Sequence, residues 1–251
     1  MPTSSPPQAV EMQEVAFILV ADDLNPGMLN LDFLKLSGIV PTDWEVTQAP
    51  SVGPGLAQFN FTNGVNLVAQ PRSATFLEAL ADKSPQDLQA PRLARRYLDK
   101  LPHGNYRGLT ITPRLLLSFP AHEDAARRFI TERLLAPGPW QDIGQAPLRA
   151  SLTLNYQLPH CAFSVAINEV RLQQTADQSI AALLFAGSFN YGLEAGEPAA
   201  KLQALHQWLA NWHGDLETFQ TLISQRFLKL APTNPPPPAS PPRSSSLFPQ
   251  L

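Results

Sequence analysis

The longest periodic pattern in the chain lies in its C-terminal third, and it constrains the fold more than any other feature. At 3.6 residues per turn, the large apolar side chains of residues 198–230 fall within an arc of about 120°. These side chains are Leu202, Leu205, Trp208, Leu209, Trp212, Leu216, Phe219, Ile223, Phe227 and Leu230. The pattern predicts one amphipathic helix roughly 50 Å long. Pro198 suits its first turn, and Gly214 is a candidate bend.

A helix of this length exceeds a single small sheet. We therefore expect it either to cross two subdomains or to present part of its apolar face to a partner. Its N-terminal half, which contains Trp208, Trp212, His206 and His213, is the preferred docking segment, because aromatic anchors dominate binding energy.

The remaining elements are shorter. Apolar runs and period-2 alternation predict strands at 15–20, 56–61, 65–70, 73–78, 106–112, 115–119, 148–158, 163–170 and 180–191. Helical periodicity predicts helices at 90–101 and 122–135. Asn63-Gly64 between two strand-like runs indicates a hairpin. The order is close to a duplicated βαβββα unit, with pseudo-repeats at 14–103 and 104–230. It predicts an α+β fold of antiparallel sheets backed by helices on one face.

Proline marks the ends of the predicted globule. Of 26 prolines, three lie in residues 1–13 and eight in residues 231–251. Such proline-rich segments do not bury a core, so we expect disordered tails at 1–13 and 231–251 around a globule at 14–230. The 235–243 stretch has the outline of a PxxP ligand; the alternative is a passive extension.

Composition narrows the class of protein. Eighteen Lys and Arg against 21 Asp and Glu give a net charge of −3, which argues against non-specific nucleic-acid binding. The longest apolar run, 15–21, is about a third of the roughly 20 residues that a membrane span needs, and no signal peptide is evident. The single cysteine, Cys161, fits a reducing compartment. We expect a cytoplasmic protein without membrane insertion.

Few residues indicate chemistry. Asp22 and Asp23, at the end of the first strand, are weak candidates for a Mg²⁺ or Ca²⁺ site; the alternative is a turn in which their side chains cap backbone donors. His206 and His213 lie seven residues apart, too far to ligate one ion alone. We interpret them as ordinary residues at the edge of the apolar face of the helix. His160 beside Cys161 suggests an activated thiol, but neighbours in a strand point to opposite faces, which favours a structural role.

Two loop residues, Trp140 and Arg149, are further candidates for partner binding, because Trp and Arg are enriched at interface hot spots. Packing in the core or at its rim explains Trp140 equally well.

Two resemblances extend this interpretation. The segment LHQWLANWHGDLETFQTLISQRFL resembles the closing helix of a sporadically distributed, uncharacterised bacterial family. The segments EVAFILVADDLNPGMLNLDFLKLSGIVP, FTNGVNLVAQ and LLAPGPWQDIGQAPLRASLTLNY are similar to conserved cyanobacterial proteins of unknown function. Both imply a fold and a lineage, and neither implies an activity or a site residue.

The sequence supports two functional hypotheses. The first is a non-enzymatic interaction, assembly or adaptor protein that binds a protein partner or associates with itself. The alternative is a small-molecule-binding protein or hydrolase with a pocket between the sheet and the long helix. Nucleotide-binding, zincin and nucleophile-elbow motifs are missing, so the sequence indicates no cofactor and favours the first hypothesis.

Overall fold

The computed structural model of the chain describes residues 10–80, 83–120, 122–173 and 179–229. The strands in these ranges are β1 (Val10–Ala21), β2 (Ser51–Val52), β3 (Ala57–Asn60), β4 (Val65–Gln70), β5 (Ser73–Ala79), β6 (Tyr106–Phe119), β7 (Leu152–Gln157), β8 (Ala162–Gln173) and β9 (Ser179–Gly192). The α-helices are α1 (Leu31–Leu36), α2 (Ala90–Lys100), α3 (Ala125–Arg128) and α4 (Pro198–Thr221). Two π-helical segments, Phe129–Leu134 and Leu222–Phe227, extend α3 and α4, and short 3-10 turns lie at Pro26–Met28, Pro85–Asp87 and Pro139–Asp142.

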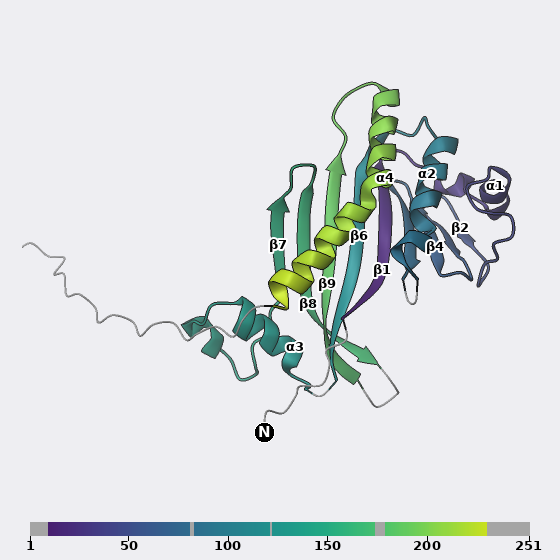
Figure 1. Cartoon of the computed structure of the whole chain (residues 1–251). Helices are drawn as coiled ribbons and strands as arrows, with labels where there is room; N and C mark the ends of the chain where they lie inside the picture. Colours follow the sequence, from purple (N-terminus) through teal and green to yellow (C-terminus); the bar gives the residue numbers. More distant parts are fainter. Residues whose placement is uncertain (1–9, 81–82, 121, 174–178, 230–251) are drawn as a thin grey trace, which may run out of the picture.

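The strands described form one antiparallel sheet in the order β2-β3-β4-β5-β1-β6-β9-β8-β7 (Figure 1). In each half, the first strand pairs with the last strand of an antiparallel meander: β1 with β5 of the meander β2–β5, and β6 with β9 of the meander β7–β9. The two first strands then pair with each other at the centre of the sheet. The predicted α+β class is confirmed, and the expected antiparallel sheets are continuous through the β1–β6 pair.

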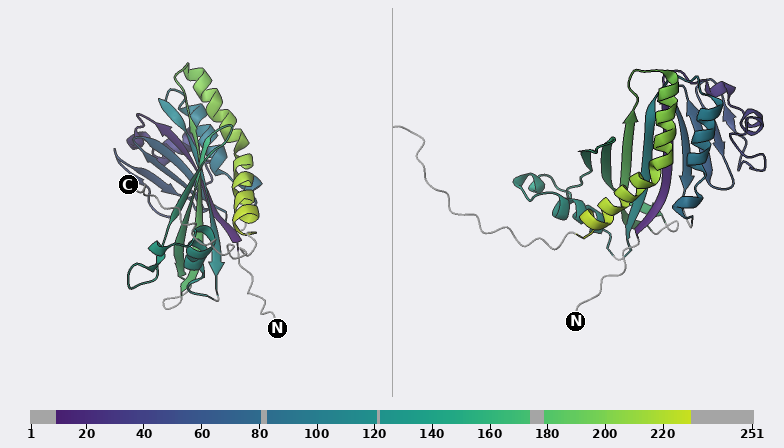
Figure 2. Two further views of the ribbon diagram at one scale, coloured as in Figure 1. Left: turned by 90° about the vertical axis from the view of Figure 1, so that its left-hand side faces the viewer. Right: turned by 45° about the horizontal axis from the view of Figure 1, so that its top comes forward.

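The core lies between this sheet and two helices that pack side by side on one of its faces, α2 and α4 (Figure 2). Strands β4 and β5 alternate between buried and more exposed positions, as an antiparallel sheet covered on one face requires. On β1 the core-facing residues Val15, Phe17 and Leu19 are fully buried. Trp212 of α4 packs edge-on against Phe17, with ring centroids 5.4 Å apart.

The long C-terminal helix runs from Pro198 to Phe227 when the π-helical end is included, so the predicted helix is confirmed. Figure 1 shows that it changes direction about midway. Near this midpoint the Thr218 hydroxyl donates a hydrogen bond to the Gly214 carbonyl at 2.7 Å, a contact that often accompanies helix bending. The predicted hairpin is also present: Gly64, between β3 and β4, has a φ of +84°.

Several predicted boundaries are wrong. Strand β1 begins at Val10, before the predicted strand at 15–20 and before the predicted start of the globule at residue 14, because Val10 and Met12 already pair with Leu117 and Leu115 of β6. The segments 106–112 and 115–119 are one strand, β6, that continues through Pro113. The 148–158 strand is confined to β7, and the 122–135 helix divides into α3 and a π-helical segment. Residues 231–251, with the PxxP-like stretch, lie outside the described residues.

Pro113 is accommodated in a central strand by its neighbours. The β6–β9 register is interrupted between Ile111 and Arg114, where proline has no N–H to donate. A Cβ atom built on Gly187 of β9 would lie 3.0 Å from Pro113 Cγ and 2.9 Å from Phe219 Cδ2 of α4. The absence of a side chain at Gly187 therefore leaves room for both rings.

A buried carboxylate anchors α2 to the sheet. Glu78 of β5 has no exposed surface. Its Oε2 accepts hydrogen bonds from the backbone N–H groups of Gln89 at 2.6 Å and Ala90 at 2.8 Å, and its Oε1 lies 2.8 Å from Lys83 Nζ. A carboxylate at a helix N-terminus satisfies donors that have no partner within the helix.

We predict that Glu78→Ala lowers the free energy of unfolding by about 3 kcal/mol, because it removes a buried ion pair and leaves the N-terminal donors of α2 unpaired. Urea denaturation measures this loss. The control is Glu217→Ala, an exposed position on α4 that should change stability by less than about 0.5 kcal/mol. Equal effects of the two substitutions would contradict the anchoring role.

The two tryptophans of α4 are expected to differ. Trp212 is buried against the sheet, so Trp212→Ala should cost about 3–5 kcal/mol. Trp208 is only half-buried, so Trp208→Ala should cost clearly less and leave a folded monomer. Thermal melts of both variants measure the difference. A loss at Trp208 as large as that at Trp212 would show that both serve the core alone.

Candidate functional site

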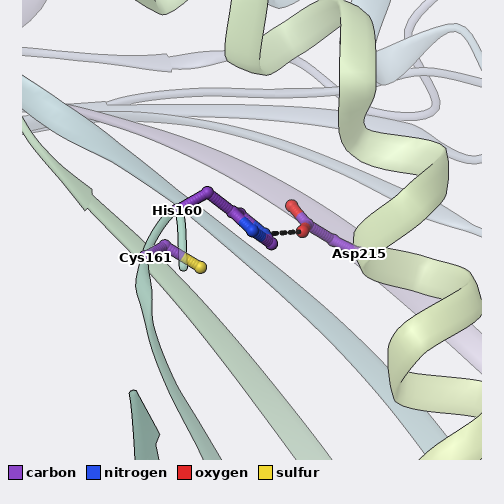
Figure 3. Close-up of side chains that lie close together, drawn as sticks. All are labelled: His160, Cys161 and Asp215. Carbon is purple, nitrogen blue, oxygen red and sulfur yellow. Dashed lines mark hydrogen bonds and ion pairs between the residues drawn. The ribbon is translucent and has the colours of Figure 1, made fainter. Parts of the chain in front are cut away.

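Three chain segments meet where the middle of α4 crosses the sheet. His160 and Cys161 lie in the turn between β7 and β8, Tyr191 lies near the end of β9, and Asp215 lies on α4. Figure 3 shows His160 and Cys161 side by side opposite Asp215, with the His160 ring directed at the carboxylate. One ligand atom from each of these three residues lies within 4.8 Å of those of the other two. We call His160, Cys161, Tyr191 and Asp215 the Asp215 cluster.

Asp215 is the centre of the cluster. Only 3% of the surface of this residue is exposed to solvent. His160 Nε2 lies 3.1 Å from Oδ1, and the Tyr191 hydroxyl donates a hydrogen bond to Oδ2 at 2.6 Å. Burial of a carboxylate is costly unless its oxygens are bonded, and here both oxygens have a partner.

The turn before β8 brings His160 and Cys161 to the same site. Leu158 N–H donates to the Cys161 carbonyl at 2.9 Å, which closes the turn after Pro159. Cys161 then continues the core-facing alternation of β8, in which Phe163 and Val165 are also buried. His160 and Cys161 therefore both approach Asp215 instead of pointing to opposite faces, because His160 lies in the turn that includes Pro159 and not in a strand.

Aromatic stacking orients the cluster. The His160 ring stacks on Tyr191 with centroids 5.9 Å apart, and Tyr191 stacks on Trp208 with centroids 5.0 Å apart. The His160 side chain remains 51% exposed. The cluster is therefore open to solvent at His160 and closed at Asp215.

Burial controls the acidity of the two weak acids. Burial, together with the negative charge of Asp215, raises the pKa of the Cys161 thiol to about 11, although a hydrogen bond with Tyr191 acts in the opposite direction. Burial also raises the pKa of Tyr191, and its hydrogen bond to Asp215 adds to this effect. Both groups are therefore protonated near neutral pH, and Cys161 does not supply a free thiolate nucleophile.

The histidines predicted on α4 do not share a site. His206 Nε2 lies 3.2 Å from Asp99 Oδ1 of α2, and its buried Nδ1 has no hydrogen-bond partner among the described residues. His213 is exposed, and its ring lies against Trp212 with centroids 3.8 Å apart. Trp212 itself belongs to the core, so Trp208 is the aromatic residue of this group that remains accessible.

The two loop candidates are both exposed. Trp140 lies in a 3-10 turn and is 44% exposed. Arg149 Nε lies 3.9 Å from Glu169 Oε2 of β8, and its side chain is largely exposed. The structure thus assigns Arg149 a surface ion pair.

The carboxylates at the end of β1 have other partners. Asp22 accepts hydrogen bonds from Arg107 Nε at 2.7 Å and from Asn105 Nδ2 at 3.0 Å. The hydrogen bond from Arg107 lowers the pKa of Asp22. Asp23 is exposed. A cation at Asp22 would have to compete with the Arg107 guanidinium, so the geometry argues against a metal site at these weak candidates.

Asp215 is the functional candidate that sequence reasoning missed. It lies three residues after Trp212 and four before Phe219, next to Trp208 at the edge of the apolar arc of the helix. A carboxylate bordering the apolar face of an amphipathic helix is a weak signal, and only its burial in the structure shows that it requires a partner. Its partners come from segments about 25 and 55 residues away, which no local motif reveals.

Comparison with known proteins adds no assignment. No protein-family model matches the chain, and no curated protein matches it. The resemblance to cyanobacterial proteins therefore stays a prediction. Among the described helices, none has the combined length and hydropathy that crossing a bilayer requires.

The acidity of Cys161 gives a direct test of this geometry. We expect iodoacetamide to alkylate Cys161 at pH 8 roughly 100-fold more slowly than a thiol whose pKa is about 9. The pKa of Cys161 is about two higher, so a roughly 100-fold smaller fraction of it is thiolate at that pH. The rate should keep rising until the pH approaches 11. Asp215→Asn should accelerate the reaction by removing the nearby negative charge, whereas His213→Gln should not. A rate that levels off below pH 9 would contradict the raised pKa.

Proposed function

We propose that this protein is a non-enzymatic interaction or assembly protein that docks a partner protein beside Trp208. The observation that best supports this proposal is a shallow groove of about 360 Å³ between the β9–α4 connection and the first turns of α4. We call it the Trp208 groove; its lining residues are Gly192, Leu193, Glu194, Ala195, Gly196, Ala200, Lys201, Ala204 and Trp208.

The lining of the groove suits an apolar anchor. Glycine and alanine form most of its wall, which leaves room for a side chain from a partner. Trp208 is half-buried, and its ring is held on one face by Tyr191, so little conformational freedom is lost when a partner covers it. Preorganised aromatic side chains are typical of interface hot spots.

The occupant we propose is an apolar side chain of a partner protein. The charged residues of the groove, Glu194 and Lys201, have opposite signs, so the groove does not select strongly for either charge. The net charge of −3 is similarly weak, and the proposal includes no nucleic-acid partner. A cytoplasmic location belongs to the same proposal.

Docking is confined to the N-terminal half of the helix. From Leu209 onward, the apolar residues Trp212, Leu216 and Phe219 are buried against the sheet. These residues hold α4 in place. Trp208 and Ala204, one and two turns before Trp212, are partly exposed.

The alternative, a small-molecule-binding protein, is favoured by one observation: the Asp215 cluster lies between the sheet and the long helix, with His160 open to solvent. A thiol-dependent hydrolase is disfavoured, because the raised pKa keeps Cys161 protonated.

The proposal is tested by a matched pair of substitutions on α4. Ala204→Glu places a charge in the groove, whereas Ala210→Glu places the same charge on an exposed position of the same helix. We expect Ala204→Glu to reduce recovery of a reproducible partner from native extract at least about 10-fold, the effect of losing roughly 1.4 kcal/mol of binding energy. Ala210→Glu should leave recovery unchanged, and both variants should melt at similar temperatures.

Sedimentation of the purified chain distinguishes self-association from a different partner. If Ala204→Glu dissociates an oligomer of the wild type, the partner is a second copy. Recovery and oligomeric state that are equally insensitive to both substitutions would overturn the proposal.

A further inference from the structure

We propose that His160, Cys161 and Asp215 form a binding site for a zinc-class divalent cation. This inference is independent of the Trp208 groove. Among the residues that the structure describes, they are the one set of three or more His, Cys, Asp or Glu side chains whose ligand atoms gather closely enough to hold a metal ion.

The distances suit a small tetrahedral ion. Nitrogen and oxygen ligands that lie 2.0–2.1 Å from one tetrahedral ion are about 3.3 Å apart. His160 Nε2 and Asp215 Oδ1 already lie 3.1 Å apart, so these two donors require little movement. The third donor, Cys161 Sγ, lies within 4.8 Å of both, so an approach of at most about 1 Å brings it to the usual zinc–sulfur distance.

The donor set selects the class of metal. One imidazole, one thiol and one carboxylate match the borderline-soft preference of Zn²⁺ and its close analogues. Mg²⁺ and Ca²⁺ prefer oxygen ligands, and the cluster offers only the carboxylate.

Charge also favours a dication. In the described residues, the ion pair formed by the buried Asp215 is with His160, and neither Lys nor Arg pairs with it. On binding, the Cys161 thiol loses its proton to solvent and the sulfur donates an electron pair to the metal. One carboxylate, one thiolate and a dication sum to zero, so the occupied site is electrically neutral in a largely buried position.

The surroundings already orient the ligands. Tyr191 donates its hydrogen bond to Oδ2 of Asp215, which leaves Oδ1 directed at His160. Hydrogen bonds of this kind to a ligating carboxylate are typical of metal sites. The stack of His160 on Tyr191 orients the imidazole, and the exposed side of His160 provides a path to a fourth ligand position, filled by water.

Co²⁺ is the spectroscopic probe for this site. We expect the metal-free, full-length chain to bind one equivalent of Co²⁺ with a thiolate-to-cobalt charge-transfer band in the near ultraviolet, and one equivalent of Zn²⁺ to remove that band. Cys161→Ser should abolish the band, and His160→Gln should weaken Zn²⁺ binding at least about 100-fold. Tyr191→Phe should retain the band with roughly 10-fold weaker binding, because it removes only an orienting hydrogen bond.

The control is His213→Gln, which replaces an exposed histidine on α4, the helix that contains Asp215. This variant should bind Co²⁺ and Zn²⁺ as the wild type does. Because Asp215 is buried, Asp215→Asn is informative only if it remains folded, and His160→Gln and Cys161→Ser decide the question without it. Absence of the thiolate band in the wild type, or Zn²⁺ affinity unchanged in both of these variants, would overturn the site and leave the cluster as a contact between turn and helix.

Discussion

The antiparallel pairing of β1 with β6 is the interaction on which the rest of the fold depends. Each half of the chain closes its own meander onto one of these strands, so the two parts of the sheet are joined through this pair. Because the pair lies at the centre of the sheet, α2 contacts the β1 side while α4 contacts β6 and β9. The long helix therefore covers the junction between the halves, which is what its length requires, and its direction changes where it passes across the sheet (Figure 1).

Two buried carboxylates in this core are stabilised in different ways. Glu78 has a lysine and two helix N-terminal N–H groups, so its charge is compensated by groups with full or partial positive charge. Asp215 has a tyrosine hydroxyl and a half-exposed histidine instead. The first arrangement is complete without any added group and explains a structural role. In the second arrangement, His160 is the ion-pair partner of the negative charge on Asp215. Because of this difference, we propose the metal site at Asp215 and not at Glu78.

Sequence patterns predicted much of the fold and little of the site. The α+β class, the Asn63-Gly64 hairpin and the long helix follow from periodicity and turn chemistry, which are local properties. The prediction that the strand divides at Pro113 was wrong, because the room for the proline ring depends on Gly187, a residue of another strand. The Asp215 cluster was missed for the same reason: its members come from a turn, a strand and a helix, and only tertiary structure brings them together. The residues singled out on α4, His206 and His213, instead contact separate neighbours.

The contact of Gly187 with Pro113 and Phe219 has a consequence for how the chain tolerates change. At this point the Phe219 ring of α4 and the Pro113 ring occupy the space that a methyl group at position 187 would fill. The Cβ atom of an alanine at position 187 would force the Phe219 ring or the Pro113 ring to shift, although the backbone conformation there does not require glycine. A position that looks conformationally ordinary is thus restricted by steric fit alone, and the restriction links the proline of one strand to the phenylalanine of the covering helix. Replacement of any one of the three residues is expected to alter which side chains the other two positions accept.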